Sequence, residues 1–361
     1  MQIGIVGIPS SGKSTLFQAV TKTTLDPAAL AKSEAHIGTV KVPDARLERC
    51  AELFSPKRTV HATIEFVDAV GLMKGGSGSS HFTTGFFSAV KTNDALVHVV
   101  RLFEDDSVAH PEVTIDPMRD VSTFDIEFIL ADMAVLEPRL EKIHKQIQKT
   151  QDELMKRELP VLERCLALLQ EEKPLRNEEF SKDELLILKT YQLLSLKPML
   201  IALNLDETQR DLLKPEVARI AAAKAGFRTK VMAFFGKIDM EISQLSGEDA
   251  RAFMDEYGIG ESALDTLIRE SYFLLGLQSF LTVGEDECRA WTIRVGMTAQ
   301  EAAGVIHSDF YNKFIRAEVV HYDDFIAAEG STAKLRESGK WRLEGKAYVV
   351  QDGDIMEIRH G

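Results

Sequence analysis

Short apolar runs alternate with helical periodicity in the first third of the chain and again after about residue 196. Runs of four to eight residues that are rich in Val and Ile are typical of strands buried on both faces of a parallel sheet. The strands predicted in this way are residues 2–7, 36–42, 63–68, 95–102, 199–204 and 230–235. Because helical stretches separate most of them, the pattern predicts an α/β fold with a mostly parallel sheet covered on both faces.

The strand pattern stops between residues 125 and 195, where apolar residues recur at steps of three and four from Ile126 to Leu154. This spacing predicts a long amphipathic helix. A second helix is expected with Pro160 near its start. Together they predict an inserted antiparallel helical hairpin, and core helices packed on the sheet are the alternative.

The sequence pattern changes again near residue 279. Residues 289–295 alternate like a strand, and residues 298–307 predict a helix that Thr298 and Glu301 would cap as a capping box. Residues 347–358 predict a β-hairpin with Asp352-Gly353 at its turn. These elements indicate a separate small α+β module.

The amino-acid composition of the chain limits the classes of function that it could have. The 43 Lys and Arg against 56 Asp and Glu give a net charge of −13, which disfavours indiscriminate nucleic-acid binding but allows a local basic face. The three cysteines are far apart, so they favour a reducing, cytoplasmic setting over a disulfide framework or a zinc site. No apolar run approaches the roughly 18 residues that span a bilayer, and no signal peptide is expected.

The chemistry is concentrated in Gly7-Ile-Pro-Ser-Ser-Gly-Lys-Ser-Thr15, which fits the phosphate-binding pattern G-x-x-x-x-G-K-[S/T] between a strand and a helix. The glycines let consecutive N–H groups face inward as an anion nest, and the following helix directs its positive end to the same place. The predicted binding residues are Gly7, Pro9, Ser10, Ser11, Gly12, Lys13, Ser14 and Thr15. Lys13 would reach the β- and γ-phosphates and Ser14 would ligate Mg²⁺. A glycine-rich turn without a ligand is the alternative.

Two further motifs follow strands. Strand 63–68 ends in Asp68-Ala-Val-Gly71, where Asp68 would hold a water on Mg²⁺ and the Gly71 N–H would meet the γ-phosphate. Leu72 stands where Ras-type GTPases orient water with Gln, so hydrolysis would be slow or need a group from elsewhere. The Gly-rich residues 74–80 suit either a nucleotide-sensing switch or a simple loop.

Strand 199–204 ends in Asn204-Leu-Asp-Glu207, in the place where GTPases carry N-K-x-D. Leu205 replaces the Lys and Glu207 replaces the Asp that accepts hydrogen bonds from guanine. The longer Glu carboxylate would crowd the guanine edge, whereas adenine has no N2 amino group to satisfy. The motif therefore favours ATP over GTP.

These residues, in this order, resemble the YchF-type Obg-like ATPases, within the translation-factor-related P-loop proteins, and the chain looks like a divergent member. The likeness covers nearly the whole chain and is densest in residues 289–292, 306–310, 314–317, 339–346 and 351–354. It implies a P-loop G domain at residues 1–125 and 196–278, an inserted helical domain at 126–195 and a TGS domain at 279–361. It also implies ATP preferred over GTP, slow hydrolysis and association with ribosomes or ribosomal RNA. His110 occupies the place of a family histidine that is thought to help hydrolysis, and the alternative is a surface loop histidine before Pro111.

The chain departs from the family in its switch regions. Pro9-Ser-Ser-Gly-Lys13 replaces Pro-Asn-Val-Gly-Lys, and Lys32 aligns with the switch I Thr that ligates Mg²⁺, near Thr23 and Thr24. The switch II segment Gly-Glu-Gly-Leu-Gly is missing, with Gly75-Gly-Ser-Gly78 nearby. These departures affect hydrolysis more than nucleotide binding.

Three functions therefore remain open from the sequence. One is a slow ATPase that switches conformation on the ribosome, the second is a nucleotide-gated binding module with negligible hydrolysis, and the third is a conventional GTPase. For an RNA contact, the local candidate is a cation cluster around Trp341, with a solvated face as the alternative. Its members are Lys334, Arg336, Lys340, Arg342 and Lys346.

Overall fold

The computed structural model describes residues 1–24, 36–68, 82–147, 149, 152–256 and 261–361. Contacts divide the chain into two compact units. The first comprises Met1–Gly38 and Glu65–Leu267, and the second comprises Thr39–Ile64 and Ile268–Gly361. The three-part division predicted from the sequence stays a prediction.

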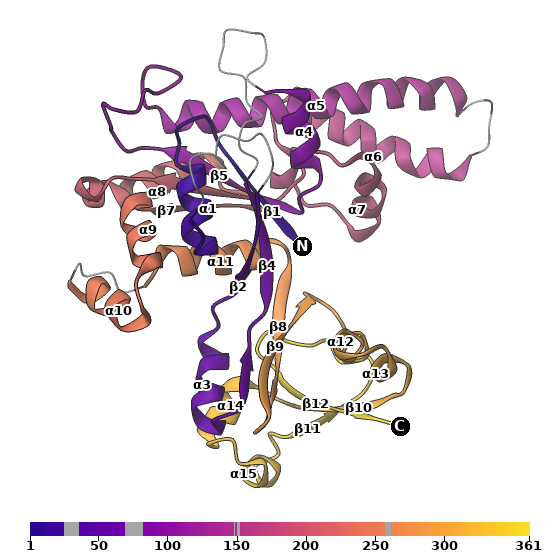
Figure 1. Ribbon diagram of the computed structural model, residues 1–361. Helices are drawn as coiled ribbons and strands as arrows, with labels where there is room; N and C mark the ends of the chain where they lie inside the picture. The colour runs from indigo at the N-terminus through magenta and orange to yellow at the C-terminus, as the bar shows by residue number, and fades with distance from the viewer. Residues whose placement is uncertain (25–35, 69–81, 148, 150–151, 257–260) are drawn as a thin grey trace. The chain divides into compact units, whose positions relative to one another are not determined.

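The first unit is built on a six-stranded sheet in the order β2-β4-β1-β5-β6-β7 (Figure 1). Its strands are β1 (Gln2–Val6), β2 (His36–Lys41), β4 (Thr63–Asp68), β5 (Ala95–Arg101), β6 (Met199–Asn204) and β7 (Thr229–Phe234). The pairings of β1 with β4 and β5, and of β6 with β5 and β7, are all parallel. The predicted α/β fold with a mostly parallel sheet is therefore confirmed, and the predicted strands lie within a residue or so of the observed bounds.

The helices of this unit follow the strands. They are α1 (Lys13–Thr21), α4 (Thr84–Lys91), α5 (Pro117–Gln146), α6 (Glu153–Gln170), α7 (Lys182–Leu188), α8 (Arg210–Lys224), α9 (Gly236–Gln244) and α10 (Gly247–Glu256), with short 3₁₀ turns η1 (Leu175–Asn177), η2 (Lys189–Tyr191) and η3 (Glu207–Gln209). Helix α11 (Ala263–Leu274) leads into the second unit. Every residue of β5 and of β6 is buried, as expected of central strands in a covered sheet.

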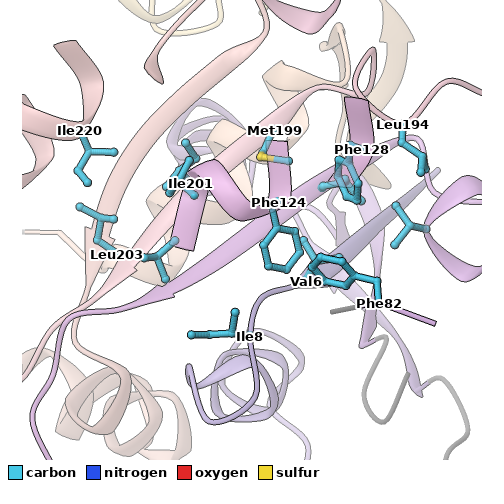
Figure 2. Packing of buried hydrophobic residues seen from close by; sticks show 14 of the residues in the cluster. Val6, Ile8, Phe82, Phe124, Phe128, Leu194, Met199, Ile201, Leu203 and Ile220 are labelled. Carbon is cyan, nitrogen blue, oxygen red and sulfur yellow. The ribbon is translucent and has the colours of Figure 1, made fainter. Parts of the chain in front are cut away.

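One core lies between the sheet and the N-terminal half of α5. Figure 2 shows Val6 and Ile8 of the first βα segment with Phe82, Phe124 and residues of β6. The ring centroids of Phe82 and Phe124 are 4.7 Å apart in an edge-on arrangement, which aromatic pairs favour. This packing anchors α5 to the face of the sheet.

A second core joins α5 to α6, which lie side by side (Figure 1). The predicted helical pair is present, but its bounds differ from the expectation. Helix α5 begins at Pro117, capped by Asp116, and ends at Gln146, so Leu154 belongs to α6. Pro160 is the eighth residue of α6 rather than near its start. Burial of Leu162 and Leu169 against α5 offsets the cost of an internal proline, which sequence alone could not weigh.

The second unit carries a mixed sheet in the order β11-β10-β12-β8-β9-β3. Its elements are α3 (Ala45–Phe54), β3 (Arg58–Val60), β8 (Leu277–Val283), β9 (Glu287–Arg294), α12 (Ala299–Ile306), α13 (Ser308–Asn312), β10 (Phe314–Val320), α14 (Tyr322–Ala327), α15 (Thr332–Glu337), β11 (Arg342–Glu344) and β12 (Ile355–His360). The predicted capping box is present, because Thr298 and Glu301 bond reciprocally at the start of α12. The strand predicted at residues 289–295 is β9.

The hairpin predicted at residues 347–358 is wrong. Only Ile355–His360 forms a strand, and it pairs with β10 and β8. The preceding backbone bonds elsewhere: the Tyr348 carbonyl accepts from the Ala299 N–H, and the Val350 N–H donates to the Met297 carbonyl. Residues near α12, about 50 positions away in sequence, therefore take the bonds that a local hairpin would have used.

Candidate nucleotide-binding site

The loop between β1 and α1 adopts a conformation that depends on its glycines. Gly12 has φ +100°, and a Cβ there would lie 2.2 Å from Asn204 Nδ2. A Cβ on Gly7 would lie 2.4 Å from the Val99 carbonyl oxygen. Both positions combine an unusual backbone with a close approach that only glycine permits.

Lys13 and Asp68 are two ionisable groups at this loop that influence each other's pKa. The Lys13 ammonium donates to the Ile8 carbonyl oxygen at 2.7 Å. Burial lowers the pKa of Lys13 to about 8, and the Asp68 charge opposes that shift. Burial raises the pKa of Asp68 to about 6, while Lys13 and the Ser14 hydroxyl act to lower it. Each group is thus held in a site that disfavours its charged form and that a charged ligand would complement.

Asp68 has unused hydrogen-bonding capacity in this site. It is fully buried, and neither carboxylate oxygen has a hydrogen-bond partner among the described residues. An orphaned buried carboxylate at the end of a strand, beside the Ser14 hydroxyl, fits the outer ligand sphere of a hard cation.

Asn204 ties the site together across the sheet. Its Nδ2 donates to the Ser11 carbonyl at 3.0 Å, and its Oδ1 accepts from the Gly236 N–H at 3.0 Å. One side chain therefore connects the phosphate-binding loop to the turn between β7 and α9.

A cavity of about 420 Å³ opens at the carboxyl edge of the sheet, which is where ligands bind in open α/β folds. Among the predicted residues it is lined by Ser10, Gly12, Thr15, Asn204, Leu205 and Glu207. Glu207 begins η3, a turn fixed by the reciprocal bonds of Asp206 and Gln209. The structure thus brings the two ends of the predicted site into one cavity.

Other predicted residues take different places. Gly7, Pro9, Ser11, Lys13 and Ser14 belong to the loop and the start of α1 without lining this cavity. His110 does not line it either, because its side chain is buried against Asp120. Gly71, Leu72, Lys32 and residues 75–78 lie outside the described residues.

Sequence reasoning missed nine of the fifteen residues that line the cavity. The missed residues are Phe103, Asp105, Val108, Asp206, Phe235, Gly236, Lys237, Ile238 and Glu241. Most of them follow directly after β5 and β7, so the carboxyl ends of the predicted strands were the signal that could have found them.

The predicted cation cluster of the second unit is largely neutralised by its neighbours. Lys334 pairs with Glu329, Arg336 with Glu318, Lys340 with Asp324 and Arg342 with Glu344. The Trp341 indole N–H also donates to Glu318. These contacts favour the alternative, a solvated face, over a surface dedicated to RNA.

A parallel sheet with a phosphate-binding loop after its first strand, and a cavity at its carboxyl edge, defines a P-loop nucleotide-binding protein. Comparison with known proteins makes the class specific. Residues 2–110 match the family MMR_HSR1, "50S ribosome-binding GTPase", and residues 277–361 match YchF-GTPase_C, "Protein of unknown function (DUF933)".

Relatives that match over nearly the full length of the chain indicate the same family. The chain is 42% identical over 360 residues to the "Ribosome-binding ATPase YchF" of Bacillus subtilis, covering 99% of this chain and 98% of the relative. It is 39% identical over 359 residues to the protein of the same name from Escherichia coli O157:H7, covering 98% of each. The solved Schizosaccharomyces pombe "YchF GTPase" is similar at a TM-score of 0.85 and 32% identity, covering 99% of this chain and 97% of that one.

The chain belongs to the YchF family, which confirms the resemblance seen in the sequence. Across the described ranges, no helix is both long enough and apolar enough to span a membrane.

Proposed function

We propose that this protein binds ATP and Mg²⁺ at the phosphate-binding loop, hydrolyses the nucleotide slowly, and acts as a conformational switch on the ribosome. The observation that carries the proposal is the cavity that joins the loop residues Ser10, Gly12 and Thr15 to Asn204 and Glu207. Its two ends suit the two ends of a nucleotide. Lys13 and the loop N–H groups would hold the β- and γ-phosphates, and the base would lie against Leu205 and Glu207.

The side chains near the loop suit Mg²⁺ by their chemistry. Ser14 would ligate Mg²⁺ and Asp68 would hold a water on it, since Mg²⁺ keeps several waters and uses few protein ligands beside nucleotide phosphates. When bound, the metal would neutralise charge on the phosphates. His110 would assist hydrolysis.

The names of the relatives imply different nucleotides, because the bacterial proteins are called ATPases and the yeast protein is called a GTPase. Glu207 supports ATP for this chain. Its longer carboxylate would crowd the guanine edge, and the capping bonds of Asp206 and Gln209 fix the backbone turn that carries it. Part of the ribosome proposal comes from the relatives' names, "Ribosome-binding ATPase", and it would place the protein in the cytoplasm.

Glu207→Asp is expected to shift preference toward GTP by roughly tenfold, because a shorter carboxylate can accept two hydrogen bonds from guanine. The measurement is a parallel titration of nucleotide-free wild type and variant with fluorescent ATP and GTP analogues in Mg²⁺. Glu241→Asp, at another acidic position of the same cavity, is the matched control and should leave the preference unchanged. Wild type that binds GTP at least as tightly as ATP would show that the protein is a GTPase or has dual specificity.

Association with the ribosome is expected to depend on the nucleotide. We expect co-sedimentation with purified ribosomes to differ between ATP, ADP and no nucleotide, because a switch must bind its partner unequally in its states. The Lys13→Ala variant should show one level of association under all three conditions. Equal association of wild type in all three would contradict the switch, and no association at all would contradict the ribosomal partner.

A further inference from the structure

Phe235 is an aromatic residue that follows β7 directly and lines the nucleotide cavity. Phe103, which follows β5, lines the same cavity. Because β5 and β7 flank β6, the two rings come from strands on either side of Leu205, at the end of β6. The Phe103 N–H donates to the Asn204 carbonyl at 3.1 Å, and the Leu205 N–H donates to the Phe234 carbonyl at 3.0 Å. The end of the cavity where the base would lie therefore has a largely apolar wall built from three strand exits.

The backbone that carries Phe235 is fixed from two sides. Its N–H donates to Asp239 Oδ2 at 2.8 Å, and its carbonyl accepts from the Asp239 N–H at 2.8 Å. Asp239 is only 4% exposed. The next residue, Gly236, donates its N–H to Asn204 Oδ1 at 3.0 Å. The position of the ring is thus set by the fold before any ligand arrives, which lowers the entropic cost of binding.

A guanidinium lies behind the ring of Phe235. The Arg210 Cζ atom is 5.8 Å from the ring centroid, within the range of a cation–π contact. Arg210 lines a neighbouring cavity of about 480 Å³ and not the nucleotide cavity, whereas Phe235 lines both. The ring is therefore a partition, with the guanidinium on one side and the nucleotide cavity on the other.

Core packing alone does not account for this placement. The neighbouring Phe234 is 1% exposed, as a ring used only for packing would be. Phe235 packs against the core of the sheet but stays half-buried, with part of its surface toward the cavities. An aromatic surface at a cavity suits a flat aromatic group, and stacking on a nucleobase raises affinity by roughly five- to a hundredfold.

We propose that Phe235 is a stacking wall for the base of the bound nucleotide, and that Arg210 is a positioning residue that keeps the ring at the cavity. The inference rests on the proposed nucleotide-binding function, and it adds the source of affinity for the base. Stacking is tolerant of base identity, because every base has a π-face. Phe235 therefore contributes affinity for adenine and guanine alike, whereas Glu207 contributes the preference between them.

Phe235→Leu removes the ring and is expected to weaken binding of fluorescent ATP and GTP analogues equally, by roughly tenfold. Tripolyphosphate has no base, so its affinity, measured by competition, should be the same in this variant and in wild type. Phe235→Trp should bind ATP at least as tightly as wild type, because an indole also stacks. Phe227→Leu is the matched control, since Phe227 is 65% exposed before the start of β7 and does not line the cavity.

Two further measurements separate stacking from a structural role. In Phe235→Trp, indole fluorescence should be quenched by ATP and not by tripolyphosphate, with wild type giving the background of Trp291 and Trp341, which belong to the second unit. Arg210→Met should weaken ATP binding by about two- to fivefold, the range of a cation–π contact, without affecting tripolyphosphate. Added to Phe235→Leu, it should cause no further loss, because Arg210 acts through the ring.

Unchanged ATP affinity in Phe235→Leu would overturn the stacking wall, and an equal loss of ATP and tripolyphosphate would assign the ring a structural role instead. If that variant folds poorly, Phe235→Trp decides, since quenching by both ligands or by neither would contradict stacking. Wild type that binds neither ATP nor tripolyphosphate would show that the proposed nucleotide function is wrong, and the wall falls with it. If wild type binds both, Lys13→Ala binds them weakly and the Phe235 variants match wild type, only the wall is wrong.

Discussion

Lys13→Ala is expected to lower the affinity for ATP by roughly a hundredfold, because a buried ammonium aimed at phosphates makes charge-assisted bonds that alanine cannot. Phosphate release should fall by about 10²- to 10³-fold, the range seen when one preorganised donor is removed. The fold itself should survive. Lys13 is buried at a cost that lowers its pKa to about 8, so its removal relieves desolvation. The pKa of Asp68, now about 6, should rise further without its neighbouring cation.

The measurements are equilibrium titration with a fluorescent ATP analogue and multiple-turnover phosphate release. Lys182→Ala is the control, since Lys182 lies on the exposed start of α7 and does not line the cavity. Equal ATP affinity in Lys13→Ala and wild type would exclude the phosphate-binding loop as the site.

Arg176→Met is expected to destabilise the first unit by about 3 kcal/mol, because removing one member of a buried ion pair leaves the other charge only partly compensated. Arg176 is 1% exposed and donates to Asp125 and to Thr229 Oγ1. Burial alone would raise the pKa of Asp125, but Arg176 and Lys224 hold it below its ordinary value. In the variant, Asp125 keeps only Lys224, whose ammonium is 3.2 Å away.

Urea unfolding followed by circular dichroism measures this loss. Arg164→Met is the matched control, because Arg164 is 42% exposed in its ion pairs on α6 and should lose about 1 kcal/mol or less. Adding Asp125→Asn to Arg176→Met should recover part of the stability, since the buried charge is then removed too. A loss no greater than that of Arg164→Met would mean that the buried network contributes little.

Much of the fold could be predicted from local pattern. The runs that became β1, β4, β5, β6 and β7 are rich in apolar residues, and hydrophobic periodicity is the strongest local signal of secondary structure. The errors fell where local signals compete with distant ones. Pro160 looked like a helix start, yet packing of α6 against α5 carries the helix through it.

The candidate site also has one part that local sequence predicts and another part that it does not. Its phosphate end was predictable because the glycines, Lys13 and Ser14 lie within one loop, with Asp68 at the end of a recognisable strand. The rest of the cavity wall was not predicted, since Phe103 and Phe235 carry no motif and are brought together only by the order of β5, β6 and β7. The burial of the His110 side chain beside Asp120 was also beyond prediction, because only the folded loop brings the two residues together.

By itself, then, the sequence determined the α/β class, the family and the phosphate-binding loop, because each is encoded by residues that are neighbours in the chain. Tertiary structure alone decided which side chains complete the site. The bond from Asn204 to the Ser11 carbonyl spans 193 positions of sequence. Such a contact exists because the sheet places the carboxyl ends of β1 and β6 at the same edge, on either side of β5, and no local propensity of either segment specifies that distance.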